Sequence, residues 1–131
     1  MTERPVPPTP KPATMVLRAL TLRCPVCGTG GLFRHWVRIV PRCPTCGFRF
    51  DRGEEGYNVG TYMFNLIAAE LILAVLVVGA ALTFDLQWST TIERIAIGAM
   101  IVMPVLFYPF AKLLFVAFDL CFRPVRKEDV N

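Results

Sequence analysis

Two long apolar stretches in the second half of the chain restrict its fold more than any other feature. Residues 62–84, YMFNLIAAELILAVLVVGAALTF, hold a single charged side chain, Glu70, and residues 95–118 hold only Lys112. Because a helix rises about 1.5 Å per residue, each stretch is long enough to cross about 30 Å of hydrocarbon. The sequence therefore predicts a membrane protein that contains a hairpin of two transmembrane helices. It leaves open whether the second helix ends near Lys112 or continues toward Phe122.

The basic residues are distributed unevenly around these two helices. Nine of the 14 lysines and arginines precede residue 62, three follow residue 118, and the connecting segment 85–94 contains only Arg94. Because basic segments are retained in the cytoplasm, this bias predicts cytoplasmic termini and an extracytoplasmic loop at 85–94, with Trp88 at the outer interface. The bias also accounts for the net charge of +4 without a nucleic-acid partner. Residues 119–131 would then form a cytoplasmic basic tail.

The chain before the helices divides into three segments. Residues 1–12, MTERPVPPTPKP, contain five prolines and lack the apolar core of a signal peptide, so we expect a disordered tail. Residues 13–52 carry four of the five cysteines and are predicted to form a cytoplasmic zinc-ribbon module. Residues 53–61, GEEGYNVGT, combine glycines with two glutamates and are predicted to be a linker.

The cysteine module contains the motif Arg-Cys-Pro-x-Cys-Gly twice, at residues 23–28 and 42–47. Two Cys-x-x-Cys pairs at this separation are typical of a four-thiolate zinc site, in which a glycine after each pair adopts positive φ and closes the turn. A rubredoxin-like iron site has the same pattern but is less favoured. Four protein ligands leave no open position for a catalytic water, so the pattern indicates a structural metal and no enzyme. The predicted ligands are Cys24, Cys27, Cys43 and Cys46.

Residues 32–40, LFRHWVRIV, lie between the two cysteine pairs and alternate between apolar and polar side chains. This pattern predicts one strand of a ribbon hairpin, with Arg34, Trp36 and Arg38 on the same face. Such a face is suited to anionic lipid headgroups, nucleic acid or a protein partner, although the pattern favours a merely solvated face. A module of this size has too small a core to fold alone, so metal binding would supply its folding free energy.

The segments CPVCGTGGLF and RCPTCGF, followed by an acidic linker and two apolar stretches, resemble the bacterial Domain of Unknown Function 983 family. The resemblance covers residues 17–127. It implies a small inner-membrane protein with a cytoplasmic zinc ribbon, whose ligands by correspondence are the same four cysteines. It implies no activity.

The charged residues within the two predicted helices require partners, because an unpaired charge in hydrocarbon costs a few kcal/mol. If Phe84 and Ile95 mark the outer helix ends, Glu70 and Lys112 lie about 21 and 26 Å further in. We therefore predict that a Glu70 to Lys112 pair joins the helices. The alternative is that Glu70 is protonated or reaches toward the interface while Lys112 marks the cytoplasmic boundary. Two prolines, Pro104 and Pro109, are expected to kink the second helix by freeing the carbonyls of Met100 and Val105.

These features favour a non-enzymatic protein of the bacterial inner membrane. Its structural zinc ribbon would bind a protein partner, and the chain would act as an accessory or assembly factor of a membrane complex. Two alternatives stay open, namely a membrane-tethered binder of nucleic acid or anionic lipid, and a protein that handles metal ions. A chain with two membrane helices encloses no channel of its own, so any transport would require an oligomer or a host complex.

Overall fold

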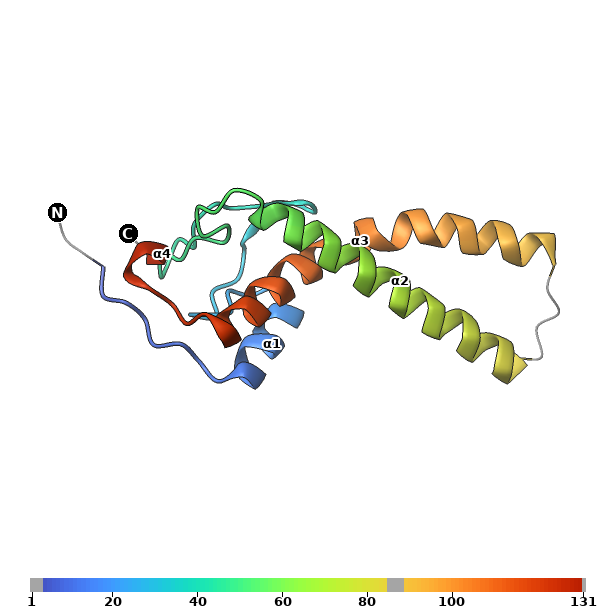
Figure 1. The fold of residues 1–131 in the computed structure, drawn as a ribbon, viewed down its shortest axis with the longest axis horizontal. Helices are drawn as coiled ribbons and strands as arrows, with labels where there is room; N and C mark the ends of the chain where they lie inside the picture. The colour runs from blue at the N-terminus through green and yellow to red at the C-terminus, as the bar shows by residue number, and fades with distance from the viewer. Residues whose placement is uncertain (1–3, 85–88, 131) are drawn as a thin grey trace.

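Two long antiparallel helices, α2 (Tyr57–Phe84) and α3 (Thr90–Phe122), define the long axis of the structure. The structure is a computed structural model that describes residues 4–84 and 89–130 (Figure 1). Both helices are long and apolar enough to cross a membrane. Each begins five residues before its predicted start, and α3 continues ten residues beyond Lys112, which answers the question of where it ends. Trp88 lies outside the described residues.

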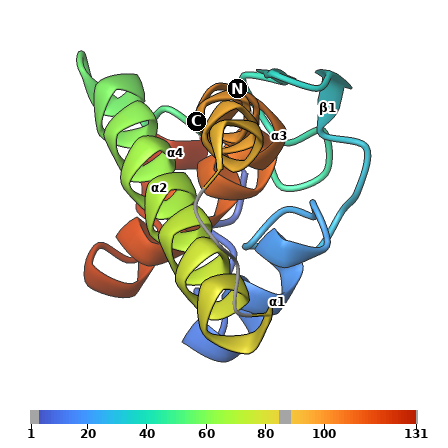
Figure 2. The ribbon, with the colours of Figure 1, turned by 90° about the vertical axis from the view of Figure 1, so that its right-hand side faces the viewer.

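The shorter elements gather around one end of this helix pair, which we call the inner end (Figure 1). They are the helix α1 (Pro12–Leu20), the strands β1 (Phe33–His35) and β2 (Arg38–Ile39), and the helix α4 (Lys127–Val130). Seen along the helices, α3 lies between α2 on one side and β1 on the other (Figure 2). At the opposite, outer end α2 and α3 diverge and expose large apolar side chains such as Leu82 and Phe84.

The cysteine module shares one hydrophobic core with the inner end of α3. Phe48 and Phe50 from the module are buried together with Met15 from α1 and with Leu113 and Val116 from α3. The amphipathic character of α1 explains its place in this core, because Met15 and Ala19 lie one turn apart on its buried face. The module is therefore packed against α3, which supplies part of the core that the module is too small to form alone.

The segment between the cysteine pairs is a hairpin in itself, so the prediction of a single strand over residues 32–40 is wrong. The chain reverses at Trp36 and Val37, and Phe33 pairs with Ile39 while His35 pairs with Arg38. As a consequence, Arg34, Trp36 and Arg38 do not share one face. Arg34 and Arg38 lie in opposite strands, and Trp36 lies at the turn.

Trp36 binds the helix α3 at its proline kink. The ring nitrogen Nε1 donates a hydrogen bond to the Val105 carbonyl at 2.9 Å, and the indole lies edge-on to Phe110. Pro109 has no N–H, so the Val105 carbonyl lacks its usual donor four residues later in the helix. The hairpin therefore satisfies the carbonyl that the proline frees. Figure 1 shows α3 changing direction in this part of the helix.

The two long helices meet at their inner ends in a register that the sequence did not predict. Lys112 is 2% exposed, and its Nζ donates to Asn58 Oδ1 at 2.7 Å and to Thr61 Oγ1 at 3.4 Å. Gly60 permits this close approach, because a Cβ there would come 2.9 Å from a ring carbon of Phe115.

The predicted ion pair between Glu70 and Lys112 does not form in the structure. Lys112 instead binds side chains 9 and 12 residues before Glu70 in α2. The prediction assumed that the outer end of the second helix is at Ile95, but α3 begins at Thr90, where Ser89 caps it by accepting from the Ile92 N–H. This earlier start shifts the register of α3 along α2, and it carries Lys112 past Glu70 to the inner end.

A buried arginine attaches the C-terminal segment to the cysteine module. The Arg52 guanidinium lies 3.1 Å from an Asp119 carboxylate oxygen and 3.8 Å from one of Asp129, and it donates to the Arg123 carbonyl. The Arg52 side chain is only 3% exposed. The predicted basic tail at 119–131 is therefore, over its described part, a helix end and a short helix packed on the module.

The proline-rich segment also has a defined course over its described residues. Residues 4–11 run beside the C-terminal segment, and the Thr9 hydroxyl accepts a hydrogen bond from the Val125 N–H at 3.2 Å. Arg4 reaches Gly47 in the second cysteine turn, where an added Cβ would lie 2.5 Å from the Arg4 guanidinium. The prediction of a disordered tail thus missed contacts that depend on the folded C-terminal segment.

We predict that Arg52→Met releases the C-terminal segment. The substitution keeps most of the side-chain volume but leaves the carboxylates of Asp119 and Asp129 without their buried cation, which costs about 3 kcal/mol of stability. Limited proteolysis should then cleave residues 123–130 faster than in the wild type. Arg38→Met, at an exposed arginine, is the control and should leave cleavage unchanged. Equal cleavage of both variants would contradict the assignment.

We also predict that Trp36 and Pro109 are energetically coupled. Trp36→Phe removes the donor to the Val105 carbonyl and should cost about 1 kcal/mol in a chain that contains Pro109. In a Pro109→Ala background the backbone N–H at position 109 can serve that carbonyl, so Trp36→Phe should cost less. Thermal unfolding of the four variants in detergent gives the coupling. Strictly additive effects would show that the hydrogen bond does not compensate for the proline.

Candidate metal centre

Each Cys-x-x-Cys pair lies in a tight turn, and the two turns have matching hydrogen bonds. In the first, the Cys24 N–H donates to the Thr29 carbonyl and the Gly28 N–H donates to the Cys24 carbonyl, both at 2.8 Å. In the second turn, the Cys43 N–H donates to the Phe48 carbonyl and the Gly47 N–H donates to the Cys43 carbonyl, both at 2.9 Å. The closing glycines have φ values of 82° and 77°, which a side chain would strain. The repeated sequence motif therefore produces a repeated backbone geometry.

These two turns bring the four predicted thiols together. The Sγ atoms of Cys24, Cys27, Cys43 and Cys46 all lie within 4.8 Å of one another. Cys24 and Cys46 are separated by 3.8 Å, and Cys27 and Cys43 by 3.5 Å, so each close pair joins one turn to the other. Cys24 and Cys43 are buried, and the other two cysteines are half-buried. The cluster can hold a metal ion between the two turns.

Three of the four thiols have shifted pKa values. Cys24 and Cys46 share a hydrogen bond, which lowers the pKa of Cys46 to about 5 and, together with burial, raises the pKa of Cys24. Burial likewise raises the pKa of Cys43. In the metal-free cluster Cys46 is therefore more acidic than Cys24 and Cys43, which resist ionisation.

An arginine from α1 supports the first turn, and sequence reasoning missed it. The Arg18 guanidinium donates to the Val26 carbonyl at 2.7 Å and to the Pro25 carbonyl at 3.2 Å. It also lies against Gly28, where a Cβ would come 3.2 Å from Arg18 Nε. The helical spacing of Arg18 relative to the buried Met15 and Ala19 is visible in the sequence, but its partner depends on how α1 packs.

Arg42 in the second motif and Arg49 just after it bind protein groups. Arg42 donates to the Val130 carbonyl at 3.4 Å, and Arg49 lies 3.4 Å from the Asp51 carboxylate. The Arg49 N–H donates to the Asp129 carbonyl at 2.8 Å, so the second turn is held by the C-terminal helix as the first is held by α1. Elements from both ends of the chain thus position the cluster.

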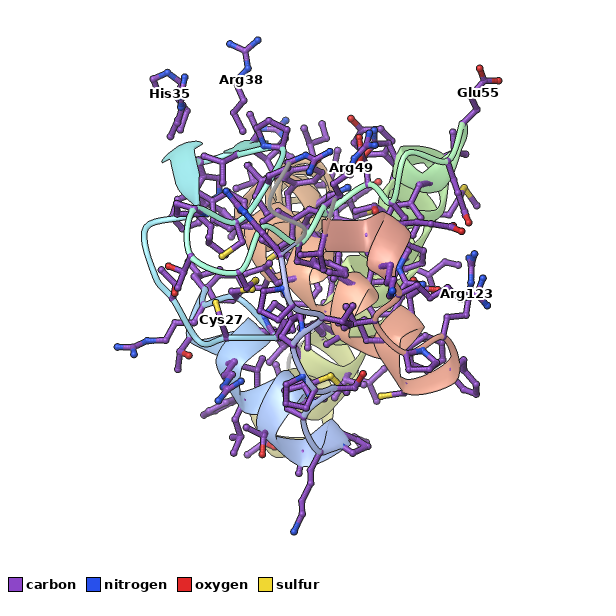
Figure 3. The ribbon with its side chains drawn as sticks, turned by 90° about the vertical axis from the view of Figure 1, so that its left-hand side faces the viewer. Cys27, His35, Arg38, Arg49, Glu55 and Arg123 are labelled. Carbon is purple, nitrogen blue, oxygen red and sulfur yellow. The ribbon has the colours of Figure 1, made fainter. Side chains whose placement is uncertain are left out.

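The remaining side chains that the sequence singled out lie apart from the cluster. His35 and Arg38 extend from the hairpin at the top of Figure 3, away from Cys27. The fifth cysteine, Cys121, is exposed on α3 and donates to the Ala117 carbonyl. Among the described residues, no histidine or carboxylate joins the four thiols.

We predict that binding of Zn²⁺ to the metal-free protein strengthens with rising pH. A zinc-bound thiolate must lose its proton, and Cys24 and Cys43 have raised pKa values, so binding should release at least two protons. The apparent affinity should then rise by about a hundredfold per pH unit near neutrality. Competition with a chromophoric chelator at pH 6.5 and 7.5 measures this slope, and Cys121→Ser should reproduce it. An affinity independent of pH would show that the thiols are already ionised.

Comparison with known proteins connects this arrangement to one family. Neither the curated proteins nor the solved structures contain a match to the chain. A family match extends over residues 33–119, which includes the hairpin, the second cysteine pair, all of α2 and most of α3. The first cysteine pair precedes the matched region, but its thiols complete the cluster in space. The chain therefore belongs to the family described as protein of unknown function (DUF983).

Proposed function

We propose that this chain is a non-enzymatic protein of the bacterial inner membrane, in which a structural zinc ribbon presents a binding surface to a protein partner. In this role it acts as an accessory or assembly factor of a membrane complex. The observation that carries the proposal is the core shared by the cysteine module and α3. Because of this core, a metal in the cluster would hold the module in one orientation on the membrane helices.

The dimensions of the cluster suit a tetrahedral metal ion held by four thiolates. In a tetrahedral site with Zn–S bonds of about 2.3 Å, neighbouring sulfur atoms lie about 3.8 Å apart. The two close sulfur pairs, at 3.8 and 3.5 Å, are near this value. Four thiolates also suit iron, but zinc is the commoner structural ion of paired Cys-x-x-Cys turns. Four protein ligands would fill the coordination sphere, which supports a structural role.

The distribution of charge supports a cytoplasmic inner end. The described N-terminal and C-terminal segments and the cysteine module lie together there (Figure 1). Most of the chain's basic residues belong to these segments, as the positive-inside rule requires of a cytoplasmic side. Trp36, Tyr62 and Tyr108 contribute aromatic side chains near the kink in α3, as is common at a membrane interface.

The surface of the module suits an acidic partner. Three arginines, Arg34, Arg42 and Arg49, line a hollow of about 510 Å³ together with Val40, Pro41 and Pro44. Guanidinium groups bind carboxylates through paired, charge-assisted hydrogen bonds, and the prolines supply an apolar floor. A protein segment that combines acidic and apolar side chains would fit this hollow.

The contacts of Trp36 weigh against the nucleic-acid alternative. Its ring nitrogen and one ring edge are engaged with α3, and the ring is about half exposed. Single-stranded nucleic acid is usually bound by stacking bases on free aromatic faces between basic side chains. Because these contacts hold the Trp36 ring against α3 and reduce the ring surface open to a base, Arg34 and Arg38 are better suited to phosphate or carboxylate groups than to bases.

We predict that partner binding depends on the metal cluster. Affinity purification of the tagged full-length protein from its own membranes in mild detergent should recover a stoichiometric protein complex and one zinc ion per chain. Cys24→Ser with Cys27→Ser should lose both, because two ligands are missing and the module loses its fixed orientation. Cys121→Ser is the matched control and should keep both.

The other outcomes of this experiment separate the alternatives. A complex that survives without the metal would show that the ribbon does not hold the binding surface. Zinc that leaves the folded protein readily in the presence of a chelator would favour metal handling, because a structural site should exchange only on unfolding. Purification of the protein with zinc but without any partner would contradict the proposed function.

A further inference from the structure

A groove lies beside the kink in α3, at the inner part of the helix pair. It has a volume of about 290 Å³, and it is walled by the hairpin turn, by α2 and by α3. The lining residues are Val37, Tyr62, Asn65, Pro104, Val105 and Tyr108. The rings of Tyr62 and Tyr108 stack with their centroids 5.8 Å apart. The groove is mostly apolar, and residues of the hairpin turn, α2 and α3 all line it.

Asn65 contributes an unpaired polar atom to this region. Its side-chain nitrogen donates to the Pro104 carbonyl at 2.9 Å, which fixes the orientation of the amide, because a carbonyl can only accept. Asn65 is 6% exposed, and its oxygen Oδ1 is buried without a hydrogen-bond partner among the described residues. A buried acceptor without a donor is costly, so a ligand that supplies a hydrogen-bond donor would be stabilised there.

The depth of the groove places it where lipid headgroups meet acyl chains. This step rests on the membrane orientation of the proposed function. Asn65 lies seven residues beyond Asn58, which binds Lys112, and is therefore about 10 Å further toward the outer end. If Lys112 marks the inner boundary, Asn65 lies just inside it, and the ring of Trp36 lies at a similar level.

Charged and apolar surfaces flank the groove on opposite sides. Arg34 and Arg38 belong to the hairpin whose turn lines the groove, and both are exposed. The Arg38 side chain extends away from the hairpin at the top of Figure 3. Further out, Ile72 and Leu76 follow Asn65 on the same face of α2, because 7 and 11 residues are close to two and three helical turns. They belong to an apolar hollow of about 260 Å³ on that helix.

We propose that this groove binds one phospholipid whose headgroup is anionic and carries a hydrogen-bond donor, as in phosphatidylglycerol. A headgroup hydroxyl donates to Asn65 Oδ1, and the phosphate contacts the exposed guanidinium group of Arg38, which follows the groove residue Val37 in the hairpin. One acyl chain follows Ile72 and Leu76 toward the outer end. Phosphatidylcholine carries the same phosphate but has no donor in its headgroup and no net charge. The site therefore discriminates between these two lipids.

Native mass spectrometry of the full-length protein tests this proposal. Zinc-loaded protein is equilibrated with mixed micelles that contain equal amounts of phosphatidylglycerol and phosphatidylcholine. The wild type should retain one phosphatidylglycerol molecule in preference to phosphatidylcholine. Asn65→Leu should reduce this preference about tenfold, because the acceptor is lost at similar side-chain volume. Thr83→Val, a comparable substitution at the exposed outer end of α2, should leave the preference unchanged.

A second variant keeps the test valid if Asn65→Leu fails to fold. Arg38→Gln changes only an exposed side chain of the hairpin, and it should also reduce the preference for phosphatidylglycerol. Equal retention of both lipids by the wild type would overturn the proposal, and so would retention of a non-lipid molecule in the groove. Flotation of the protein with vesicles separates these results from a failure of the proposed function. If the protein does not float, the membrane placement itself is wrong.

Discussion

The buried guanidinium of Arg52 joins the cysteine module to the C-terminal segment. It lies in the loop after the second cysteine turn and pairs with Asp119 at the end of α3 and with Asp129 in α4. Because the Arg52 side chain is only 3% exposed, removing either the arginine or its carboxylate partners would leave a buried charge unpaired. The arginine thus sets where the C-terminal segment returns to the module and how the module sits on α3. The second cysteine turn depends on this placement, since Arg49 binds the Asp129 carbonyl.

Polar groups of the long helices also form contacts between different elements. Three such contacts lie near the inner end. Lys112 binds Asn58 and Thr61, Asn65 binds the Pro104 carbonyl, and Trp36 binds the carbonyl that Pro109 frees. These contacts hold the inner halves of α2 and α3 together, whereas the outer halves diverge and present apolar surface. Such a division suits a protein whose inner end is organised by polar contacts and whose outer end is surrounded by lipid.

The shared core and the buried ion pairs fix the cysteine module relative to the long helices, and this rigidity bears on function. A zinc ribbon on a flexible linker could sample many orientations, but a ribbon with a shared core and a buried ion-pair network presents its surface in one orientation relative to the helices. An accessory factor that must match a cytoplasmic surface and a membrane helix of its partner at the same time would benefit from that fixed relation. The proposed lipid groove lies at the junction of the same elements, so an occupant there would contact the hairpin and both helices.

The sequence by itself determined the two cysteine turns that bring the four thiols together and the two long helices. Both are local properties: Cys-x-x-Cys followed by glycine defines each turn within six residues, and an uninterrupted apolar stretch defines a helix. The sequence also indicated the kink, because proline removes a specific hydrogen-bond donor. Only the tertiary structure decided which groups pair with the freed carbonyl and with the charged side chains. Trp36 meets Val105 and Arg52 meets Asp129 across more than 60 residues, and Lys112 meets Asn58 rather than Glu70. The physical reason is that such pairings depend on the helix register, and a start of α3 only five residues earlier changed which side chains face each other.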